Sequence, residues 1–343
     1  MNRSFAKGLA SFMIGCFAFL PTWAIPIPKL DLPLLTRNSE LILVGRVIGI
    51  KEVKRTTIEM GGRTFPAREM AAQLTVDKAL KGVPASSVVF FHFVLPGEFL
   101  GYGDVSIDQY AVFFLRNRAD TLWVLDAYYP SVVAYPGAPE AAGGDLDRVV
   151  AEVGYALVSS PRPQDRQVAV YILFDVDTPG STAALRQVAN GKDTDIRLLA
   201  MAALLRRNDI AFLDEAVKLL QSDEKNDNRE AVKGLAYVIR DGIKSPKAIP
   251  ALERLLQASD PLARQAAVAA LANTRNSKAV APLAKALQDD DQHVRYEAVF
   301  GLGKIAGQPD WRPSFEYFVQ EERRFLEHWK DWAKSQEQKH ARF

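Results

Sequence analysis

Cysteine is nearly absent from this chain, which has one thiol, Cys16, among 343 residues. A single cysteine excludes an intramolecular disulfide framework and a zinc site built from several thiolates. An excess of one charge is also missing, because 43 lysines and arginines face 41 aspartates and glutamates, for a formal net charge of +2. Proteins that bind nucleic acid usually present a strongly basic face, so this balance predicts that nucleic acid is not the partner.

Long hydrophobic runs are scarce, and the clearest one lies near the N-terminus. Arg3 and Lys7 precede an uncharged stretch at residues 9–20, and Thr22 and Ala24 place small residues where a signal peptidase cuts. The stretch is shorter than the roughly 20 residues that a membrane-spanning helix needs. We therefore predict a signal peptide at residues 1–24, cleaved after Ala24, and a periplasmic or secreted protein without a transmembrane span.

Cys16 offers an alternative interpretation of the same segment. Residues 13–16, Met-Ile-Gly-Cys, resemble a bacterial lipoprotein box, with Met where Leu is usual. The apolar run continues through Phe17 and Leu20, which favours cleavage after Ala24 over lipidation of Cys16. Cleavage there leaves a mature chain without cysteine.

A repeated helical pattern fills the second half of the chain. One anchor position recurs at spacings of 31, 31, 36 and 31 residues and is occupied by Arg166, Arg197, Asn228, Arg264 and Arg295. Every copy has an alanine three positions after the anchor and a leucine seven positions after it, which is one face of an α-helix. Apolar pairs eight and nine positions before the anchor predict a preceding helix. Each copy is thus expected to be a helical hairpin, with a loop insertion around residues 241–246.

Acidic residues stand four positions before the later anchors. We expect the aspartates among them to cap the second helix of each hairpin, and every one of these carboxylates to favour its positive N-terminal end. The residues are Asp193, Glu224, Asp260 and Asp291. The anchor arginines either form a basic stripe for an anionic partner or satisfy carboxylates and carbonyls within the stack, and we favour the second interpretation.

The repeats resemble the short HEAT repeats of the phycobilisome-lyase type, most legibly at residues 260–287 and 289–307. The resemblance implies an all-α superhelical solenoid, assigned here to residues 145–308, and implies no particular activity. Stacked hairpins need caps at their ends. The apolar stripe that includes Phe318, Phe325 and Trp329 predicts a capping helix at residues 313–336, within a capping segment at 309–343. A membrane-surface helix is the alternative, disfavoured because its polar face also carries acids.

Residues 25–142 show the shorter period of β-strands. We expect strands at 40–50, 71–80, 88–95, 109–116 and 121–127, forming a small β-barrel. This pattern, with the Leu-Lys-Gly turn at 80–82, resembles the OB-like domain of the netrin and metalloprotease-inhibitor superfamily. The expected domain covers 38–135, after an extended segment at 25–37 and before a linker at 136–144. The animal inhibitors act through an N-terminal cysteine that this mature chain lacks, so inhibition is not carried over.

Three aromatic residues depart from their column of the repeat. Tyr171, Tyr296 and Phe300 stand one or five positions after an anchor, where most copies carry Gln, Arg, Lys, Ala or Leu. Aromatic side chains on an adaptable helix surface are typical of a protein-binding face. The alternative is that Tyr296 and Phe300 pack on the C-terminal cap and Tyr171 on the β domain.

Signs of catalysis are few, and we predict no catalytic residue, metal or cofactor. None of the four histidines has a partner at ligand spacing, and the His-Glu dyads of the similar deoxyhypusine hydroxylases are absent. The carboxylates Glu98, Asp104 and Asp108 share one loop, which leaves open an enzyme or enzyme accessory acting on glycans. The favoured hypothesis is an exported, non-enzymatic binding or scaffold protein whose solenoid contacts another protein.

Overall fold

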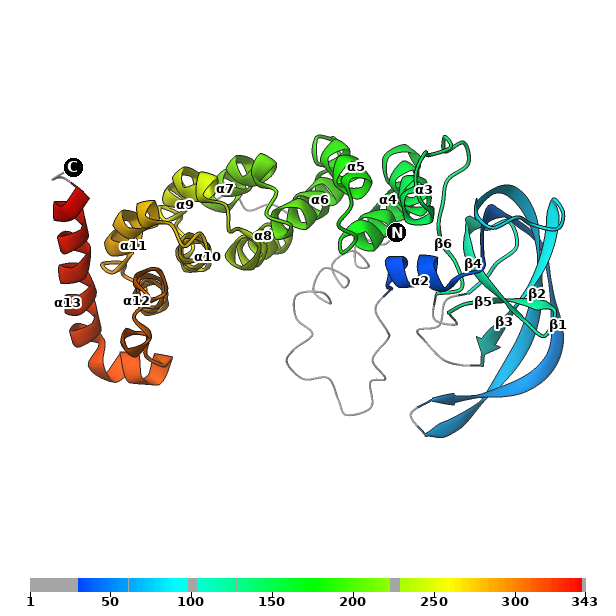
Figure 1. Ribbon diagram of the computed structural model, residues 1–343, viewed down its shortest axis with the longest axis horizontal. Coiled ribbons are helices and arrows are strands. Elements are labelled where there is room, and N and C mark those ends of the chain that lie inside the picture. The colour runs from blue at the N-terminus through cyan, green and yellow to red at the C-terminus, as the bar shows by residue number, and fades with distance from the viewer. Residues whose placement is uncertain (1–29, 61, 98–103, 127–128, 223–228, 341–343) are drawn as a thin grey trace. The chain divides into compact units, whose positions relative to one another are not determined.

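The computed structural model describes residues 30–60, 62–97, 104–126, 129–222 and 229–340, and the chain folds into two compact units (Figure 1). The first unit contains the described residues up to Gly191, and the second contains those from Lys192 onward. The predicted signal peptide at residues 1–24 and Cys16 lie outside the described residues.

A six-stranded sheet forms the N-terminal part of the first unit. Its strands are β1 (Leu41–Met60), β2 (Arg63–Lys81), β3 (Val88–Pro96), β4 (Tyr110–Arg118), β5 (Thr121–Val124) and β6 (Val132–Val133). They pair in the order β1-β2-β3-β5-β4-β6, and β1 also pairs with β4. All pairings are antiparallel except β3 with β5, which meet in parallel at His92 and Trp123.

The core of this sheet follows the strand period. Phe91 and Phe93 of β3 and Phe113 of β4 are buried, and the rings of Phe91 and Phe113 lie 4.9 Å apart. Residues two apart on a strand share a face, so β3 turns Val89, Phe91 and Phe93 into the core. The prediction that this part of the chain is a β domain is confirmed, and the domain is built on one six-stranded sheet.

The first two strands are about twice as long as the sequence predicts. The structure continues β1 beyond residue 50 to Met60 and starts β2 at Arg63, so the two form one long hairpin. Residues 51–55 are all exposed, and the segment has no alternation of buried and exposed side chains to mark it as a strand. Residues 51–55 of β1 are therefore held by backbone pairing with β2 rather than by a hydrophobic face of their own.

The described residues of the first unit form four helices. They are α2 (Leu32–Asn38), α3 (Asp145–Ser159), α4 (Pro163–Leu173) and α5 (Pro179–Ala189). Helix α2 corrects the expectation of an extended segment at 25–37. The side chain of Asp31 accepts a hydrogen bond from the backbone N of Leu34 at 2.8 Å, and Leu32 and Leu35 are buried, so a capped, apolar turn forms.

A buried ion pair joins α3 to the sheet. Lys78 Nζ of β2 lies 2.5 Å from Glu152 Oε1 of α3 and donates a hydrogen bond to the carbonyl of Ala138 at 2.6 Å. Helices α3–α5 therefore share a compact unit with the sheet, although the sequence places a linker between them at 136–144.

The second unit consists of helical hairpins. Its helices are α6 (Thr194–Arg206), α7 (Leu213–Gln221), α8 (Arg229–Gly242), α9 (Ile249–Leu255), α10 (Pro261–Asn273), α11 (Val280–Ala286), α12 (Gln292–Ala306) and α13 (Phe315–His340). Short 3-10 turns η1 (Ile210–Phe212), η2 (Pro246–Ala248), η3 (Ser277–Ala279) and η4 (Pro309–Trp311) precede several of them. The second helices of the hairpins, α6, α8, α10 and α12, pack one against the next and are called here the second-helix layer (Figure 1).

The repeated apolar stripe is the core of these hairpins. Ala200, Ala267 and Ala298 are fully buried, as are the leucines that follow each of them by four residues. The predicted helical pattern is confirmed at these positions. The expected helix at 313–336 is α13, which packs on α11 and α12 and buries Phe318, Phe325 and Trp329. None of the described helices combines the length and apolar character that crossing a membrane requires.

Candidate functional site

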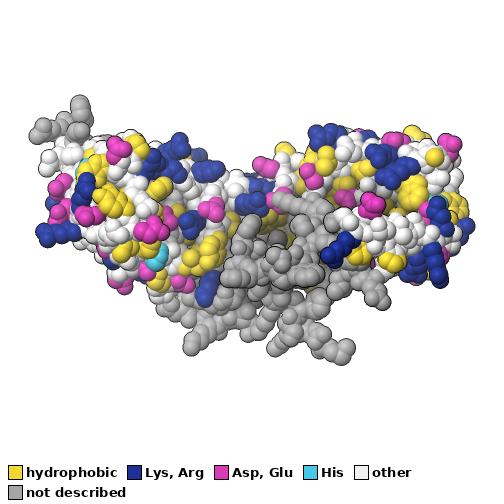
Figure 2. Space-filling model, turned by 90° about the horizontal axis from the view of Figure 1, so that it is seen from below, with side chains coloured by type: hydrophobic (Ala, Val, Ile, Leu, Met, Phe, Trp, Pro, Cys, Tyr) yellow, Lys and Arg dark blue, Asp and Glu magenta, His cyan; other side chains and the backbone are white. Residues whose placement is uncertain are grey.

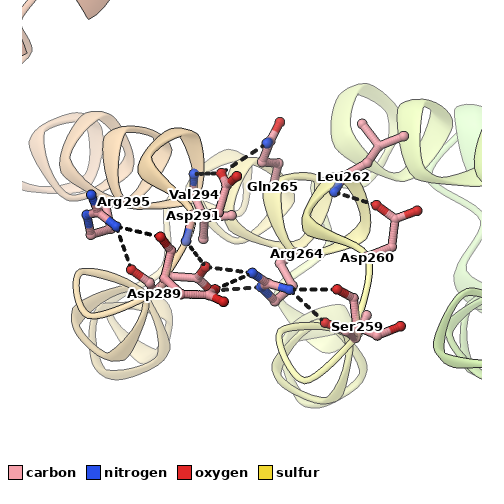
Figure 3. Close-up of polar contacts among 11 residues, drawn as sticks. Ser259, Asp260, Leu262, Arg264, Gln265, Asp289, Asp291, Val294 and Arg295 are labelled. Carbon is pink, nitrogen blue, oxygen red and sulfur yellow. Dashed lines mark hydrogen bonds and ion pairs between the residues drawn. The ribbon is translucent and has the colours of Figure 1, made fainter. Parts of the chain in front are cut away.

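The anchor arginine of one repeat is held inside the stack. Arg264 donates from Nε and Nη2 to the two carboxylate oxygens of Asp289 at 2.9 and 2.8 Å and also contacts Asp290 (Figure 3). Its Nη1 donates to the carbonyls of Ala258 and Ser259, both at 3.0 Å. Five hydrogen bonds fill the planar fork of the guanidinium, whose residue is 9% exposed. This arginine is therefore a structural group of the repeat.

Other anchors repeat the arrangement. Arg295 donates to Glu322 of α13 at 2.5 Å and to the carbonyls of Asp289 and Asp290. Arg166 donates to the carbonyl of Ser160 at 2.6 Å, and Arg197 forms an ion pair with Glu215. The interpretation that these arginines satisfy partners within the stack is confirmed. The alternative of a basic stripe made by them is wrong, and the fifth anchor, Asn228, lies outside the described residues.

The predicted aspartate caps are present. Asp193, Asp260 and Asp291 accept hydrogen bonds from the backbone N atoms of Ile196, Leu262 and Val294. The spacing from each aspartate is two or three residues, which is the geometry of a helix N-cap. Glu224 lies outside the described residues.

The three predicted partner-binding aromatics have different surroundings. Tyr296 donates to the carbonyl of Pro313 at 3.2 Å, and its ring lies 5.2 Å from Phe315 and 5.5 Å from Phe318, so it packs on the C-terminal cap. Phe300 lies 6.3 Å from Tyr296 and remains 36% exposed. Tyr171 is half-buried in the first unit, where burial raises the pKa of its phenol.

A polar network crosses three members of the second-helix layer. Asn273 of α10 donates to the carbonyl of Arg240 of α8 at 2.8 Å and accepts from Lys304 Nζ of α12 at 2.7 Å. The guanidinium of Arg240 lies 3.3 Å from Glu297 of α12. Burial raises the pKa of Glu297, an effect that the charge of Arg240 opposes. The network leaves Tyr237 of α8 and Phe300 of α12 as exposed aromatics of this layer, at 44% and 36%.

Cationic side chains also gather on this unit. Figure 2 shows Lys and Arg side chains clustered over the α6–α13 unit, with hydrophobic patches among them. Aromatic and arginine side chains are enriched in protein–protein interfaces. The second-helix layer is therefore the candidate interaction surface of this chain.

The acidic loop of the β domain is solvated where it is described. Asp104 accepts a hydrogen bond from its neighbour Val105, the carbonyl of Asp108 accepts one from Arg46, and both acidic residues are exposed. Glu98 lies outside the described residues. The two described carboxylates have the surroundings of an ordinary surface loop.

A histidine–carboxylate pair on the sheet was missed by sequence reasoning. His92 Nδ1 lies 2.8 Å from Glu69 Oε1, and Lys54 Nζ lies 3.3 Å from Glu69 Oε2, a contact between residues far apart in the sequence that the search for closely spaced ligand pairs did not address. Burial raises the pKa of Glu69, but the hydrogen bonds from His92 and Lys54 together outweigh this effect, so the net pKa falls below its ordinary value. The Trp123 ring lies 5.1 Å from the imidazole.

His92 of this pair borders a shallow cavity of about 380 Å³ whose lining also includes Ser86, Phe90 and Asp120. Glu69 faces Val94 in the pairing of β2 with β3, which makes it a diagonal neighbour of His92. Only the register of the two strands could have revealed this. Within the described residues, no three His, Cys, Asp or Glu side chains converge as a metal site.

Comparison with known proteins identifies the helical repeats. A family model for HEAT repeats matches residues 213–303 and 249–323. The chain thus contains HEAT/armadillo-like repeats, a class that commonly mediates protein–protein interaction. No curated protein matches the chain.

Several solved repeat structures are similar to part of the chain. An engineered protein is 22% identical, with 48% of this chain and 81% of that chain covered and a TM-score of 0.35. Escherichia coli YibA is 19% identical, with 48% and 67% covered and a TM-score of 0.32. A designed armadillo repeat protein in complex with the peptide (KR)4 is 21% identical, with 55% and 93% covered and a TM-score of 0.35.

Proposed function

We propose that this chain is a non-enzymatic binding protein whose second-helix layer, in the unit from Lys192 onward, recognises another protein. The proposal rests on the different surroundings of the polar and aromatic side chains of the repeats. The anchor arginines and capping aspartates serve the stack, whereas Tyr237 and Phe300 remain exposed on second helices. Aromatic side chains on a rigid scaffold lose little conformational entropy on binding and commonly anchor protein interfaces.

Site-specific photo-cross-linking tests this proposal in the producing cell. A benzophenone amino acid at Phe300 or Tyr237 is expected to capture the same discrete protein. The matched control places the probe at Lys285 of α11, which is exposed but lies on a first helix of its hairpin. Capture from Lys285 alone, or no discrete product from Phe300 and Tyr237, would contradict the proposal.

We also propose that the protein is exported and that its β domain is OB-like. Export rests on the basic, apolar and small-residue order of residues 1–24. The OB-like assignment is supported by the pairings, which run from β1 through β2, β3, β5 and β4 and return to β1. N-terminal sequencing of the protein from cell fractions is expected to begin at Ile25. A lipid-modified N-terminus at Cys16 would instead favour a lipoprotein.

A second candidate function belongs to the β domain. His92 borders a cavity and is bonded to Glu69, which favours a ligand-binding or catalytic accessory role there with glycans as the ligand class. A carboxylate that accepts from Nδ1 fixes the imidazole tautomer and leaves Nε2 as a base. A glycan-array signal lost in His92→Ala and kept in Lys51→Ala would support this role, whereas equal signals from both variants would contradict it.

A further inference from the structure

Four cations lie at the C-terminal ends of three consecutive second helices. Lys244 follows α8, Arg275 follows α10, Lys304 is in the last turn of α12, and Arg312 follows η4. We call these four the cation cluster. Helices α8, α10 and α12 pack in sequence, so their ends form one edge of the second-helix layer.

Lys304 is the fixed centre of the cation cluster. Its ammonium is held at 2.7 Å by Asn273, which is itself anchored at 2.8 Å to the carbonyl of Arg240. An ammonium group has three donors, and this bond uses one of them. The group is thus positioned by the repeat while retaining donors for a ligand.

Arg312 is positioned by a glycine. A Cβ atom on Gly303 would lie 2.4 Å from Cγ of Arg312, so the glycine makes room for the arginine stem against α12. The guanidinium carbon then lies 5.7 Å from the ring centroid of Phe300. The buried Nε of Arg312 has no hydrogen-bond partner among the described residues. An aromatic ring and a guanidinium therefore lie side by side.

The cation cluster lacks matching carboxylates. Burial lowers the pKa of Lys304, and the charges of Arg275, Arg312 and Lys244 lower it further, while Glu297 alone opposes them. Glu297 is already engaged at 3.3 Å by Arg240. Within the described part of the chain, no carboxylate forms a salt bridge with any of the four. The negative end of a helix dipole favours a nearby cation but supplies only about half a charge per helix.

We infer that the cation cluster, with Phe300 beside it, binds an acidic segment of the protein partner. Carboxylates of that segment would accept from Lys304, Arg275 and Arg312, and an apolar side chain would cover Phe300. This inference rests on the proposed function and specifies the chemistry of its partner.

The surroundings favour an acidic peptide over a nucleic acid. Glu297 acts on Lys304, and Asp241, whose side chain is 84% exposed, lies near Glu297 and Arg240. A phosphate backbone carries a charge at every step and would be repelled at these carboxylates. A peptide can space its acids to avoid them, and charge complementarity of this kind selects partners and speeds association.

Fluorescence anisotropy with the full mature chain tests the inference. The probe is a fluorescein-labelled peptide of alternating Glu and Ser with a central Leu, and the comparison probe has Gln in place of Glu. The double variant Lys304→Gln/Arg275→Gln is expected to bind the Glu probe at least about tenfold more weakly, because each cation donates a charge-assisted hydrogen bond. The matched control, Lys278→Gln/Lys285→Gln, removes the same charge from η3 and α11 and is expected to bind as wild type.

The outcomes separate the inference from the proposed function. Binding of the Glu probe that is lost in high salt and in the double variant, with unchanged thermal melting, supports the inference. Equal weakening by the control pair, equal binding of the Gln probe, or tighter binding of oligo-dT at the same residues would overturn it. If Phe300 cross-links a discrete protein that excess Glu probe does not displace, the proposed function stands and the acidic-segment inference fails.

Discussion

Both units contain a buried ion pair between distant elements, and the two pairs are satisfied differently. In the first unit, Lys78 meets Glu152, which is 2% exposed and whose Oε2 has no hydrogen-bond partner among the described residues. In the second unit, Arg264 meets Asp289 through two parallel hydrogen bonds, and further carbonyls fill its remaining donors. The comparison is between an isolated pair and a fully bonded network.

The pKa values of the two carboxyls show the consequence. Burial raises the pKa of Glu152, and Lys78 reverses only part of that effect. Burial also raises the pKa of Asp289, but the hydrogen bonds from Arg264 and from the backbone of Asp291 lower it more, so the net pKa falls. A buried charge is therefore stabilised by the number of its hydrogen bonds as much as by the opposite charge.

The largest expected effect comes from removing Lys78. Lys78→Ala leaves the Glu152 carboxylate buried without a counter-charge, and we expect the first unit to lose about 3–5 kcal/mol of unfolding free energy. Urea unfolding, with hydrogen exchange of β2 and α3 to localise the loss, measures this. The double variant Lys78→Met/Glu152→Leu should recover most of the stability, because an apolar pair needs no compensation. If the double variant is as unstable as Lys78→Ala, the pair is not an isolated one.

Removing Arg264 should cost the second unit less. We expect Arg264→Ala to lose about 2–3 kcal/mol, because the freed Asp289 keeps its bond from the backbone N of Asp291 and Asp290 is 91% exposed. Arg264→Lys should recover only part of this loss, since an ammonium cannot form the planar fork. Equal stability of the Lys variant and wild type, in urea unfolding of α10 and α12 followed by hydrogen exchange, would show that charge alone matters.

Acidification should change the contributions of Asp289 and Glu152 to the unfolding free energy in opposite directions. Asp289 has a folded pKa below its ordinary value of 3.8, so its contribution is present above that value and is lost as the pH falls through the folded pKa. Glu152 has a raised pKa, so the folded state takes up its proton first and gains stability as the pH falls. Between about pH 7 and about pH 3, Asp289→Asn should lose less stability than wild type and Glu152→Gln should lose more. Melting temperatures measured across this pH range test both predictions. If the melting temperatures of the two variants fall equally with pH, the comparison is refuted.

The smallest expected effect is at Phe300. Because it is 36% exposed, Phe300→Ala should change unfolding free energy by about 0.5–1 kcal/mol while abolishing partner cross-linking from Tyr237. Tyr296→Ala should cost about 2 kcal/mol, because its ring packs on Phe315 and Phe318. Urea unfolding of both variants measures the difference. A greater loss at Phe300 than at Tyr296 would make Phe300 a core residue.

The helical repeats were largely predictable because each copy repeats the same local requirement. Alanine and leucine recur at the buried positions of the second helices, and aspartate recurs where a second helix begins. The pattern is weak in any one copy, but five copies of the repeat reinforce one another. The role of the anchor arginine followed from the same column. Tyr296 and Phe300 are both aromatics four residues apart on α12, and their different exposure depends on where α13 packs, which no column of the repeat encodes.

The first unit was predictable only in outline. Residues 51–55 of β1 are all exposed, so the alternation that marks a strand is missing there. The pairs His92–Glu69 and Lys78–Glu152 join residues 23 and 74 positions apart. Predicting the first pair requires the register of β2 against β3, and predicting the second requires the position of α3 on the sheet. The sequence around these residues gives no information on either.

The ion pair of Arg240 with Glu297 reaches past a whole repeat. Unfolding of a solenoid is ordinarily described by a chain of units in which each unit is coupled only to its immediate neighbours. This pair, with Asn273 bridging α8 to α12, adds a next-nearest-neighbour term to that chain. We therefore expect that opening the junction between α8 and α10 also weakens α12, so that these three hairpins unfold more cooperatively than coupling between immediate neighbours alone predicts.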